Sequence, residues 1–465
     1  MDELRSNAEN WLVELFRREM GLCAPRTFSR GVYASQSLIE RIDLFGKLKG
    51  HQGCVNSIEF NSTGDTIVSG SDDLDIKLWD WATKKLKLSY MSGHQDNVFH
   101  AKIMPYTDDR IIVTASADSQ VRLGQLLENG SVETKKLSEH QGQSHSLAVE
   151  RGNPHIFYSC GEDGLVQHYD LRSCSATKLF YCSSLRGKTN SSSAIDTNSI
   201  DIDQRNPTYF ALGGGDVYAR IYDIRKCQLN GSAKKGSPVD TFCPHHLIRK
   251  TGSITAICFS SSSELLVSYS GELIYLFQKN MGLGMVPESE GSHKPDEPQE
   301  YLGHLNVKTV KGVNFLGPNS EYVVSGSDCG HVFIWEKKGG ELIRLMRGDR
   351  EIVNQVESHP LIPVVATSGL GKSIKLWSPS SSYVRSLPDN LDKILEVNRR
   401  GRVRSRAAVP SEAIINALRL YERQEQLGIV GERLNMEDVE SDSDDEGEAF
   451  LLGLLGDGSE DRGSF

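Results

Sequence analysis

Residues 67–80 read IVSGSDDLDIKLWD, and this stretch decides the fold. Apolar and polar residues alternate on either side of a polar turn, which is the pattern of two strands joined by a tight connection. Clear copies are VSGSDCGHVFIW at 324–335 and ATSGLGKSIKLW at 366–377, so the stretch is one unit of a repeat. Weaker copies lie at 114–123, 159–170, 212–223 and 266–277.

The seven copies follow one another at a spacing of about 40–60 residues. Propeller blades of four strands each repeat at about this period. We therefore predict an all-β fold, a seven-bladed β-propeller over residues 38–380. The alternating segment 38–45 precedes the first unit, and we expect it to form the outer strand of the last blade. Such a strand closes the ring and removes open sheet edges.

The units resemble the repeats of the WD40 family. Gly-His pairs at 50–51, 93–94 and 303–304 stand where that family opens a blade, and Glu139-His140 keeps only the histidine. The resemblance implies a buried structural network in the first blade, because buried polar groups without partners are costly. Its members are His51, Ser69, Asp73 and Trp79.

Several units depart from this pattern. Gly124 replaces the aromatic residue of the second blade. Cys329 takes the aspartate position of the sixth blade, directly after Asp328. Gly371 and Gly271 stand at that position in the seventh and fifth blades. We expect these blades to be held mainly by apolar packing.

Composition and charge limit the class of protein. The 465 residues are 38% hydrophobic and 25% charged, which is a globular balance. The sequence has no run of about 18 apolar residues, so it predicts no membrane-spanning helix. The charged first residues argue against a secretory signal. Nine scattered cysteines without a CxxC pair favour a reducing compartment. We expect neither a membrane partner nor a disulfide scaffold.

The negative charge is concentrated at the end of the sequence. Residues 437–465 hold eleven acids and one base, and subtracting them from 62 acids and 52 bases leaves 51 of each. Residues 1–436 therefore carry no net positive charge that would indicate direct nucleic-acid binding. We expect 437–465 to be an acidic, disordered tail that is dispensable for folding.

Two further flanks surround the propeller. Residues 1–37 begin with a capping box at 6–9, which predicts a helix with Trp11, Leu12, Leu15 and Phe16 on one stripe. This helix either packs on its own propeller or docks into another protein. Residues 381–436 form a basic and helical flank, with a helix expected over 411–426. Five arginines at 399–406 are either solvated or a nuclear-import signal, and we expect the protein in nucleus and cytoplasm.

Three connections are longer than a plain repeat needs, at 183–198, 228–250 and 278–300. We expect each to join the end of one blade to the first strand of the next, on the face that carries the Gly-His turns. They are either surface loops or an enlarged rim for a protein partner.

The sequence contains no motif of an enzyme. Neither GxxxxGK[ST] nor HExxH nor GxSxG occurs. His245-His246 reads as a polar loop rather than a metal site, and Gly213-Gly214-Gly215 is a turn with no helix after it. We therefore predict a non-catalytic protein without cofactor or metal.

Two successive blades end in the same four-residue pattern. Blade three reads Tyr169-Asp170-Leu171-Arg172, and blade four reads Tyr222-Asp223-Ile224-Arg225. The pattern resembles that of WD40 proteins that dock on the damaged-DNA-binding adaptor of the cullin-4 ubiquitin ligase. Each arginine should emerge on the face opposite the Gly-His turns, where its planar fork can bind carboxylates or carbonyls. The predicted docking residues are Tyr169, Asp170, Arg172, Tyr222, Asp223 and Arg225.

Further stretches are similar to the branch of cullin-4-associated factors that contains factor 8. They include SGHQDNVF at 92–99, FCPHHL at 242–247 and KGVNF at 311–315. The resemblance implies a substrate receptor, with the adaptor and, through it, cullin-4 as partners and an unknown protein as substrate. A WD40 scaffold of a chromatin or RNA-processing assembly, without a ligase, is the alternative.

Overall fold

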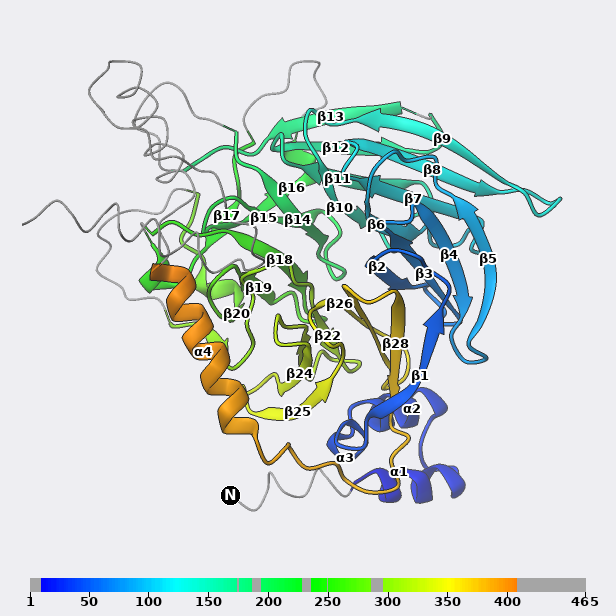
Figure 1. Cartoon of the computed structure of the whole chain (residues 1–465), viewed down its shortest axis with the longest axis vertical. Helices are drawn as coiled ribbons and strands as arrows, with labels where there is room; N and C mark the ends of the chain where they lie inside the picture. The colour runs from blue at the N-terminus through cyan, green and yellow to red at the C-terminus, as the bar shows by residue number, and fades with distance from the viewer. Residues whose placement is uncertain are drawn as a thin grey trace, which may run out of the picture. The chain divides into compact units, whose positions relative to one another are not determined.

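Seven antiparallel sheets of four strands surround a central axis in the unit Met1–Ala407, as the computed structural model shows (Figure 1). The predicted seven-bladed propeller is therefore confirmed. The structure describes residues 10–173, 175–185, 194–227, 236–248, 250–285 and 296–407. The predicted helix at 411–426 and the acidic tail lie outside these residues.

The strands follow the chain in order, four to a blade. Blade one holds β2 (Val55–Phe60), β3 (Thr66–Ser71), β4 (Asp75–Asp80) and β5 (Lys85–Met91). Blade two holds β6 (Val98–Ile103), β7 (Ile111–Ser116), β8 (Gln120–Leu126) and β9 (Val132–Glu139). Blade three holds β10 (Ser144–Val149), β11 (Ile156–Gly161), β12 (Leu165–Asp170) and β13 (Ser175–Tyr181). Blade four holds β14 (Thr197–Ile202), β15 (Tyr209–Gly214), β16 (Ala219–Asp223) and β17 (Asp240–Phe242).

The remaining blades repeat this plan. Blade five holds β18 (Ile254–Phe259), β19 (Leu265–Tyr269), β20 (Ile274–Phe277) and β21 (Gln299–Tyr301). Blade six holds β22 (Val313–Leu316), β23 (Tyr322–Ser325), β24 (His331–Glu336) and β25 (Leu342–Arg347). Blade seven holds β26 (Val353–Ser358), β27 (Val365–Gly369), β28 (Ser373–Ser378) and β1 (Asp43–Lys49). Short 3-10 helices are η2 (Ile224–Lys226), η3 (His245–Leu247) and η4 (Lys279–Met281).

The ring closes through the N-terminal part of the chain. Strand β1 pairs antiparallel with β28, so the first and last parts of the propeller share a sheet. The closing strand begins at Asp43 rather than Leu38, because Gln36–Ile39 form the short helix α3. Ile39 is fully buried against the core of blades six and seven, and this packing outweighs the alternation that suggested a strand.

The antiparallel order gives each blade two ends. The turns between first and second strands and between third and fourth strands share one end, which we call the bottom face. The opposite end, with the Gly-His pairs, is the top face. Neighbouring turns of the bottom face contact each other: Asn61 Nδ2 lies 2.9 Å from Asp109 Oδ2, and Arg151 Nη1 lies 2.9 Å from Gln204 Oε1.

The N-terminal helices belong to the bottom face. Helix α1 (Asn10–Glu19) packs on α2 (Pro25–Tyr33), with Arg18 above the Phe28 ring at 4.6 Å. The Tyr33 hydroxyl donates to the carbonyl oxygen of His359, and Arg30 Nη2 lies 2.6 Å from Asn319 Oδ1. Both partners lie in bottom-face turns, of blades seven and six, so α2 is attached to that face.

Helix α4 (Leu391–Ala407) runs alongside blades five and six (orange in Figure 1). Its Leu391, Ile394 and Leu395 pack against the core that blades five and six share. Asn398 Nδ2 donates to the carbonyl oxygen of Gly303 at 2.8 Å. Because Gly303 belongs to a Gly-His pair, this contact attaches α4 to the top face.

The long connections lie differently from the prediction. The insertion after β13 joins blades three and four at the top face, as expected. The segments 224–239 and 278–298, however, join third to fourth strands within blades four and five. Their described ends therefore lie at the bottom face, so the prediction was wrong for 278–300 and for the part of 228–250 that precedes β17. The described residues after β17 lead to blade five at the top, as predicted. Within the described part of the chain, no helix has the length and apolar character needed to cross a membrane.

Candidate docking surface

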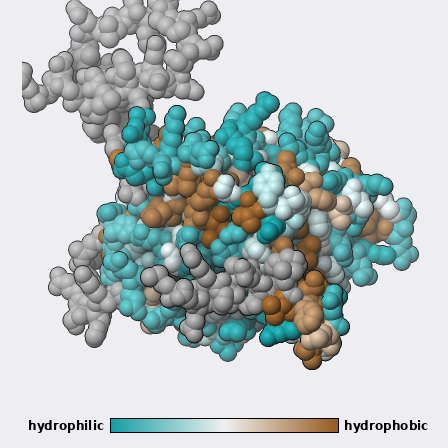
Figure 2. All heavy atoms as spheres, turned by 90° about the horizontal axis from the view of Figure 1, so that it is seen from below, coloured by the Kyte–Doolittle hydropathy of each residue, from teal (hydrophilic) through white to brown (hydrophobic). Residues whose placement is uncertain are grey.

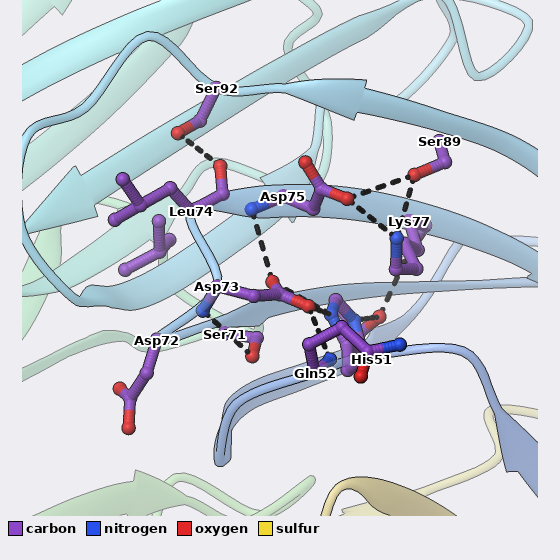
Figure 3. A network of polar contacts seen from close by, with 12 residues as sticks. His51, Gln52, Ser71, Asp72, Asp73, Leu74, Asp75, Lys77, Ser89 and Ser92 are labelled. Atoms are coloured by element: carbon purple, nitrogen blue, oxygen red, sulfur yellow. Dashed lines mark hydrogen bonds and ion pairs between the residues drawn. The ribbon is translucent and has the colours of Figure 1, made fainter.

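The structure brings together the four residues of the predicted network in blade one, and Figure 3 shows His51 and Asp73 facing each other there. His51 Nδ1 lies 2.9 Å from Asp73 Oδ2, and His51 Nε2 lies 2.8 Å from Ser69 Oγ. The indole N–H of Trp79 donates to the same hydroxyl at 2.8 Å. Asp73 also accepts from the backbone N–H of Gln52 at 2.7 Å. Each of these four side chains thus has its polar partner inside the blade, which suits a structural role.

Blades two and three repeat this chain of contacts. His94 and His140 each place Nδ1 3.0 Å from an aspartate, which is Asp118 or Asp163. In blade two, Tyr90 of the neighbouring blade fills the space beside Gly124, where a side chain would approach the Tyr90 hydroxyl within 2.5 Å. The missing aromatic residue is thus replaced from outside its own repeat.

The other blades use buried polar contacts that the sequence analysis missed. Lys311 and Asp328 form an ion pair in blade six at 2.5 Å, with side-chain exposures of 0% and 1%. In blade seven Lys375 pairs with Asp349, and in blade five Asn306 Nδ2 donates to Thr255 Oγ1 at 2.8 Å. Apolar clusters fill these blades, as expected, and buried cations and amides add polar contacts that the expectation did not include. Asp328, next to Cys329 in the repeat, was the available indication.

The two predicted docking turns project from the bottom face of adjacent blades. Asp170 and Asp223 end the third strands β12 and β16, and the arginines follow two residues later. The Arg172 side chain is 65% exposed, and that of Arg225 is 65% exposed as well. The tyrosines do not reach this surface, because Tyr169 and Tyr222 are both 1% exposed. They anchor the strand ends.

Each arginine is held by its own aspartate. Arg172 donates from Nε to Asp170 Oδ1 at 2.9 Å and from Nη2 to Oδ2 at 2.8 Å. Arg225 makes the same two contacts with Asp223, at 3.0 and 2.8 Å. The hydrogen bonds from Arg172 hold the pKa of Asp170 at about 2, and those from Arg225 lower the pKa of Asp223. Two guanidinium groups are thus fixed in orientation before any partner arrives.

A small apolar cavity lies near the second turn. It measures about 200 Å³ and lies between blades four and five. Tyr209, which interacts with Arg225, lines it together with Phe242 and Phe277. The bottom face therefore offers an apolar hollow beside an exposed cation.

The predicted docking helix is α1, and it also belongs to the bottom face. Phe16 is 59% exposed and Leu15 is half-buried. Nothing is described for the side chains of Trp11 and Leu12. Figure 2 shows apolar residues (brown) gathered among polar ones on the side of the molecule seen from below. Further exposed apolar residues of the two helices and their connection are Val13, Met20 and Leu22.

The arginine cluster at 399–406 is part of α4. Arg402 is buried and donates to the carbonyl oxygen of His304, so it is occupied in the fold. Arg399 and Arg400 both bind Glu396, at 2.7 and 2.8 Å. These contacts favour a structural role for part of the cluster.

A polar channel runs along the propeller axis, with a volume of about 890 Å³. Lys102 Nζ lies 2.9 Å from Glu59 Oε1, and Asn314 Nδ2 lies 2.7 Å from Glu357 Oε2. Burial and the nearby Glu59 raise the pKa of Glu357 to about 8. In the ranges that the structure describes, no cluster of three or more histidine, cysteine or acidic side chains is suited to a metal ion.

Known proteins resemble this chain in sequence. The family described as WD domain, G-beta repeat matches residues 43–80 and 297–336. Human WD and tetratricopeptide repeats protein 1 is 30% identical, over 79% of this chain and 89% of its own length. The chain belongs to the WD40-repeat family.

Two further relatives are much longer than the part of them that this chain matches. Human DDB1- and CUL4-associated factor 6 is 32% identical, over 81% of this chain and 44% of its own length. Protein ALTERED SEED GERMINATION 2 of Arabidopsis thaliana is 35% identical, over 53% of this chain and 37% of its own. The chain thus spans less than half of each of these relatives. WD40 propellers with such relatives are typically non-catalytic scaffolds and receptors, as predicted here.

Proposed function

We propose that the protein is a substrate receptor of a cullin-4 ubiquitin ligase and docks on DDB1, the damaged-DNA-binding adaptor, through its bottom face. The observation that carries this proposal is the pair of exposed arginines in adjacent blades, each fixed by its own aspartate. The relatedness to a DDB1- and CUL4-associated factor supports the same role. We further propose that the chain belongs to the branch of factor 8.

The arginines would act as oriented donors. In each turn the Nε–Nη2 edge of the guanidinium binds the aspartate, while the side chain stays mostly exposed. A planar fork held in this way loses little conformational entropy when it binds acceptors of a partner. Helix α1, with its exposed Phe16, lies on the same face and would extend the contact.

The top face would then recruit the protein to be ubiquitinated. It lies opposite the arginines and carries the connection between blades three and four. The ligase supplies the chemistry, so the propeller needs none of its own. We propose nuclear and cytoplasmic distribution for such a receptor, which microscopy of the tagged full chain would test.

Capture of DDB1 by the tagged full chain tests the proposal. Wild type should retain DDB1 and cullin-4, whereas Arg172→Ala with Arg225→Ala should lose both. Arg350→Ala is the matched control, because it removes an exposed arginine from the top face. Retention of chromatin or RNA-processing proteins without DDB1 would instead favour the scaffold alternative.

A further inference from the structure

Blade six carries a cysteine where blades one to three carry an aspartate. Asp73, Asp118 and Asp163 each face Nδ1 of the histidine that opens the blade, at 2.9–3.0 Å. Cys329 holds the corresponding place in the repeat of blade six. The blade-opening histidine of that blade, His304, therefore lacks its carboxylate.

His304 is buried without a hydrogen-bond partner for its ring. Its ring centroid lies 6.0 Å from that of Trp335, close to the 6.2 Å between His51 and Trp79 in blade one. It is 0% exposed, and neither ring nitrogen finds a partner among the described residues. Burial lowers the pKa of His304 to about 3, so the ring is neutral and still carries one N–H donor. An acceptor is missing where the aspartate stands in blades one to three.

Donors surround the sulfur of Cys329. Asn398 Nδ2 of α4 donates to Sγ at 3.3 Å. His331 Nδ1 lies 3.1 Å from the Cys329 carbonyl oxygen and 3.4 Å from Sγ, and it must carry a hydrogen because a carbonyl only accepts. The Cys329 thiol donates to Ser327 Oγ at 3.2 Å, while the Ser327 hydroxyl donates to the Leu305 carbonyl oxygen at 3.2 Å. After loss of the thiol hydrogen, this hydroxyl can turn its own hydrogen toward the sulfur. The arrangement suits a thiolate.

The hydrogen bonds at the sulfur lower the pKa of the Cys329 thiol. Burial alone raises the pKa of Cys329, but the hydrogen bonds from His331, Ser327 and Asn398 outweigh it, so the pKa lies below its usual value. Lys311 pairs with Asp328 beside the site. Arg402 of α4 binds the backbone of His304 and adds positive charge.

Cys54 offers a contrast within the same chain. It is half-buried like Cys329, but its thiol donates to the carbonyl oxygen of Leu370 at 3.3 Å. Burial and the nearby Asp72 raise the pKa of Cys54. The two cysteines therefore differ in their readiness to form the thiolate, which is the reactive species toward peroxides.

We propose that Cys329 is a peroxide-sensitive site whose oxidised form replaces the missing aspartate of blade six. The thiolate attacks one oxygen of hydrogen peroxide, an S–O bond forms as the O–O bond breaks, and hydroxide leaves and takes up a proton to give water. A second peroxide converts the sulfenic acid into sulfinic acid and water. The sulfinate has two oxygens and one negative charge, like a carboxylate, and offers His304 an acceptor. Oxidation therefore stabilises the blade.

Peroxide titration of the full chain tests the reactivity. We would quantify by mass spectrometry the Cys329 and Cys54 peptides that gain one or two oxygen atoms. A thiol whose pKa is one unit lower has more thiolate at neutral pH, but each thiolate is a weaker nucleophile. The net effect is a reaction with peroxide that is about threefold faster. Cys329 should react faster than Cys54, and Asn398→Ala should reduce this difference. Equal rates at Cys329 and Cys54 would overturn the proposal.

Melting temperatures test the role as a carboxylate substitute. Cys329→Asp should melt above Cys329→Ser, because only the aspartate can accept from His304. Peroxide should raise the melting temperature of the wild type and leave that of Cys329→Ser unchanged, a comparison that does not depend on the aspartate variant. A wild type that melts lower after oxidation of Cys329 would contradict the proposal.

Discussion

Replacing Asp73 with alanine removes the acceptor at the centre of the blade-one network. The carboxylate accepts from His51 Nδ1 at 2.9 Å, from Gln52 N–H at 2.7 Å and from Asp75 N–H at 3.1 Å. His51 is 4% exposed, so water cannot readily replace the lost partner. A buried donor left unpaired costs about 1–3 kcal/mol, and we expect a loss of this size in the free energy of unfolding. The melting temperature should fall by roughly 2–6 °C.

Urea denaturation followed by tryptophan fluorescence measures this loss, because Trp79 belongs to the same network. Asp65→Ala is the matched control, since Asp65 is exposed in a bottom-face turn of the same blade, and it should change stability by less than about 0.5 kcal/mol. An Asp73→Ala variant that is as stable as the control but loses a binding partner would show that the network is a site rather than a support.

Three other perturbations have defined outcomes. Burial lowers the pKa of His51 and of His94, so below about pH 6.5 the unfolded chain binds more protons than the folded one. The urea midpoint should therefore be lower at pH 5 than at pH 7. A constant midpoint would contradict neutral, buried histidines. Lys311→Met leaves Asp328 buried without its cation and should cost about 3–5 kcal/mol of unfolding free energy, and a loss below about 1 kcal/mol would mean that the pair is not buried. Phe16→Ala should leave the melting temperature unchanged and weaken DDB1 capture by about 1 kcal/mol or more, while unchanged capture would remove α1 from the interface.

The repeat made the propeller predictable from sequence. Each unit carries its own alternation and its own polar turn, so seven weak patterns support one another and fix the blade count. The network of blade one was predictable for the same reason, because His51 and Asp73 belong to the repeat itself. The turns with Arg172 and Arg225 follow directly from strand ends, so their face was predictable once the blades were counted.

Contacts between blades and flanks were not predictable in this way. Tyr90 replaces the aromatic residue missing at Gly124, and Asn398 reaches the sixth blade from a helix about 70 residues further along the chain. No local pattern encodes such pairs. The connection 278–298 was misplaced because β21 is only three residues long and leaves almost no alternation to read. Short edge strands therefore limit what the pattern can show.

Titration of purified DDB1 against the purified full chain tests the central claim most directly. The wild type should bind with a measurable Kd, and Arg172→Ala with Arg225→Ala should raise that Kd by about thirtyfold or more, because acceptors of the partner lose charge-assisted bonds. Lysine at both positions should restore binding only in part, since a point charge cannot reproduce the fork. The melting temperature should stay near that of the wild type, because both side chains are 65% exposed. A double variant that is folded and binds DDB1 with unchanged Kd would contradict docking through the arginines.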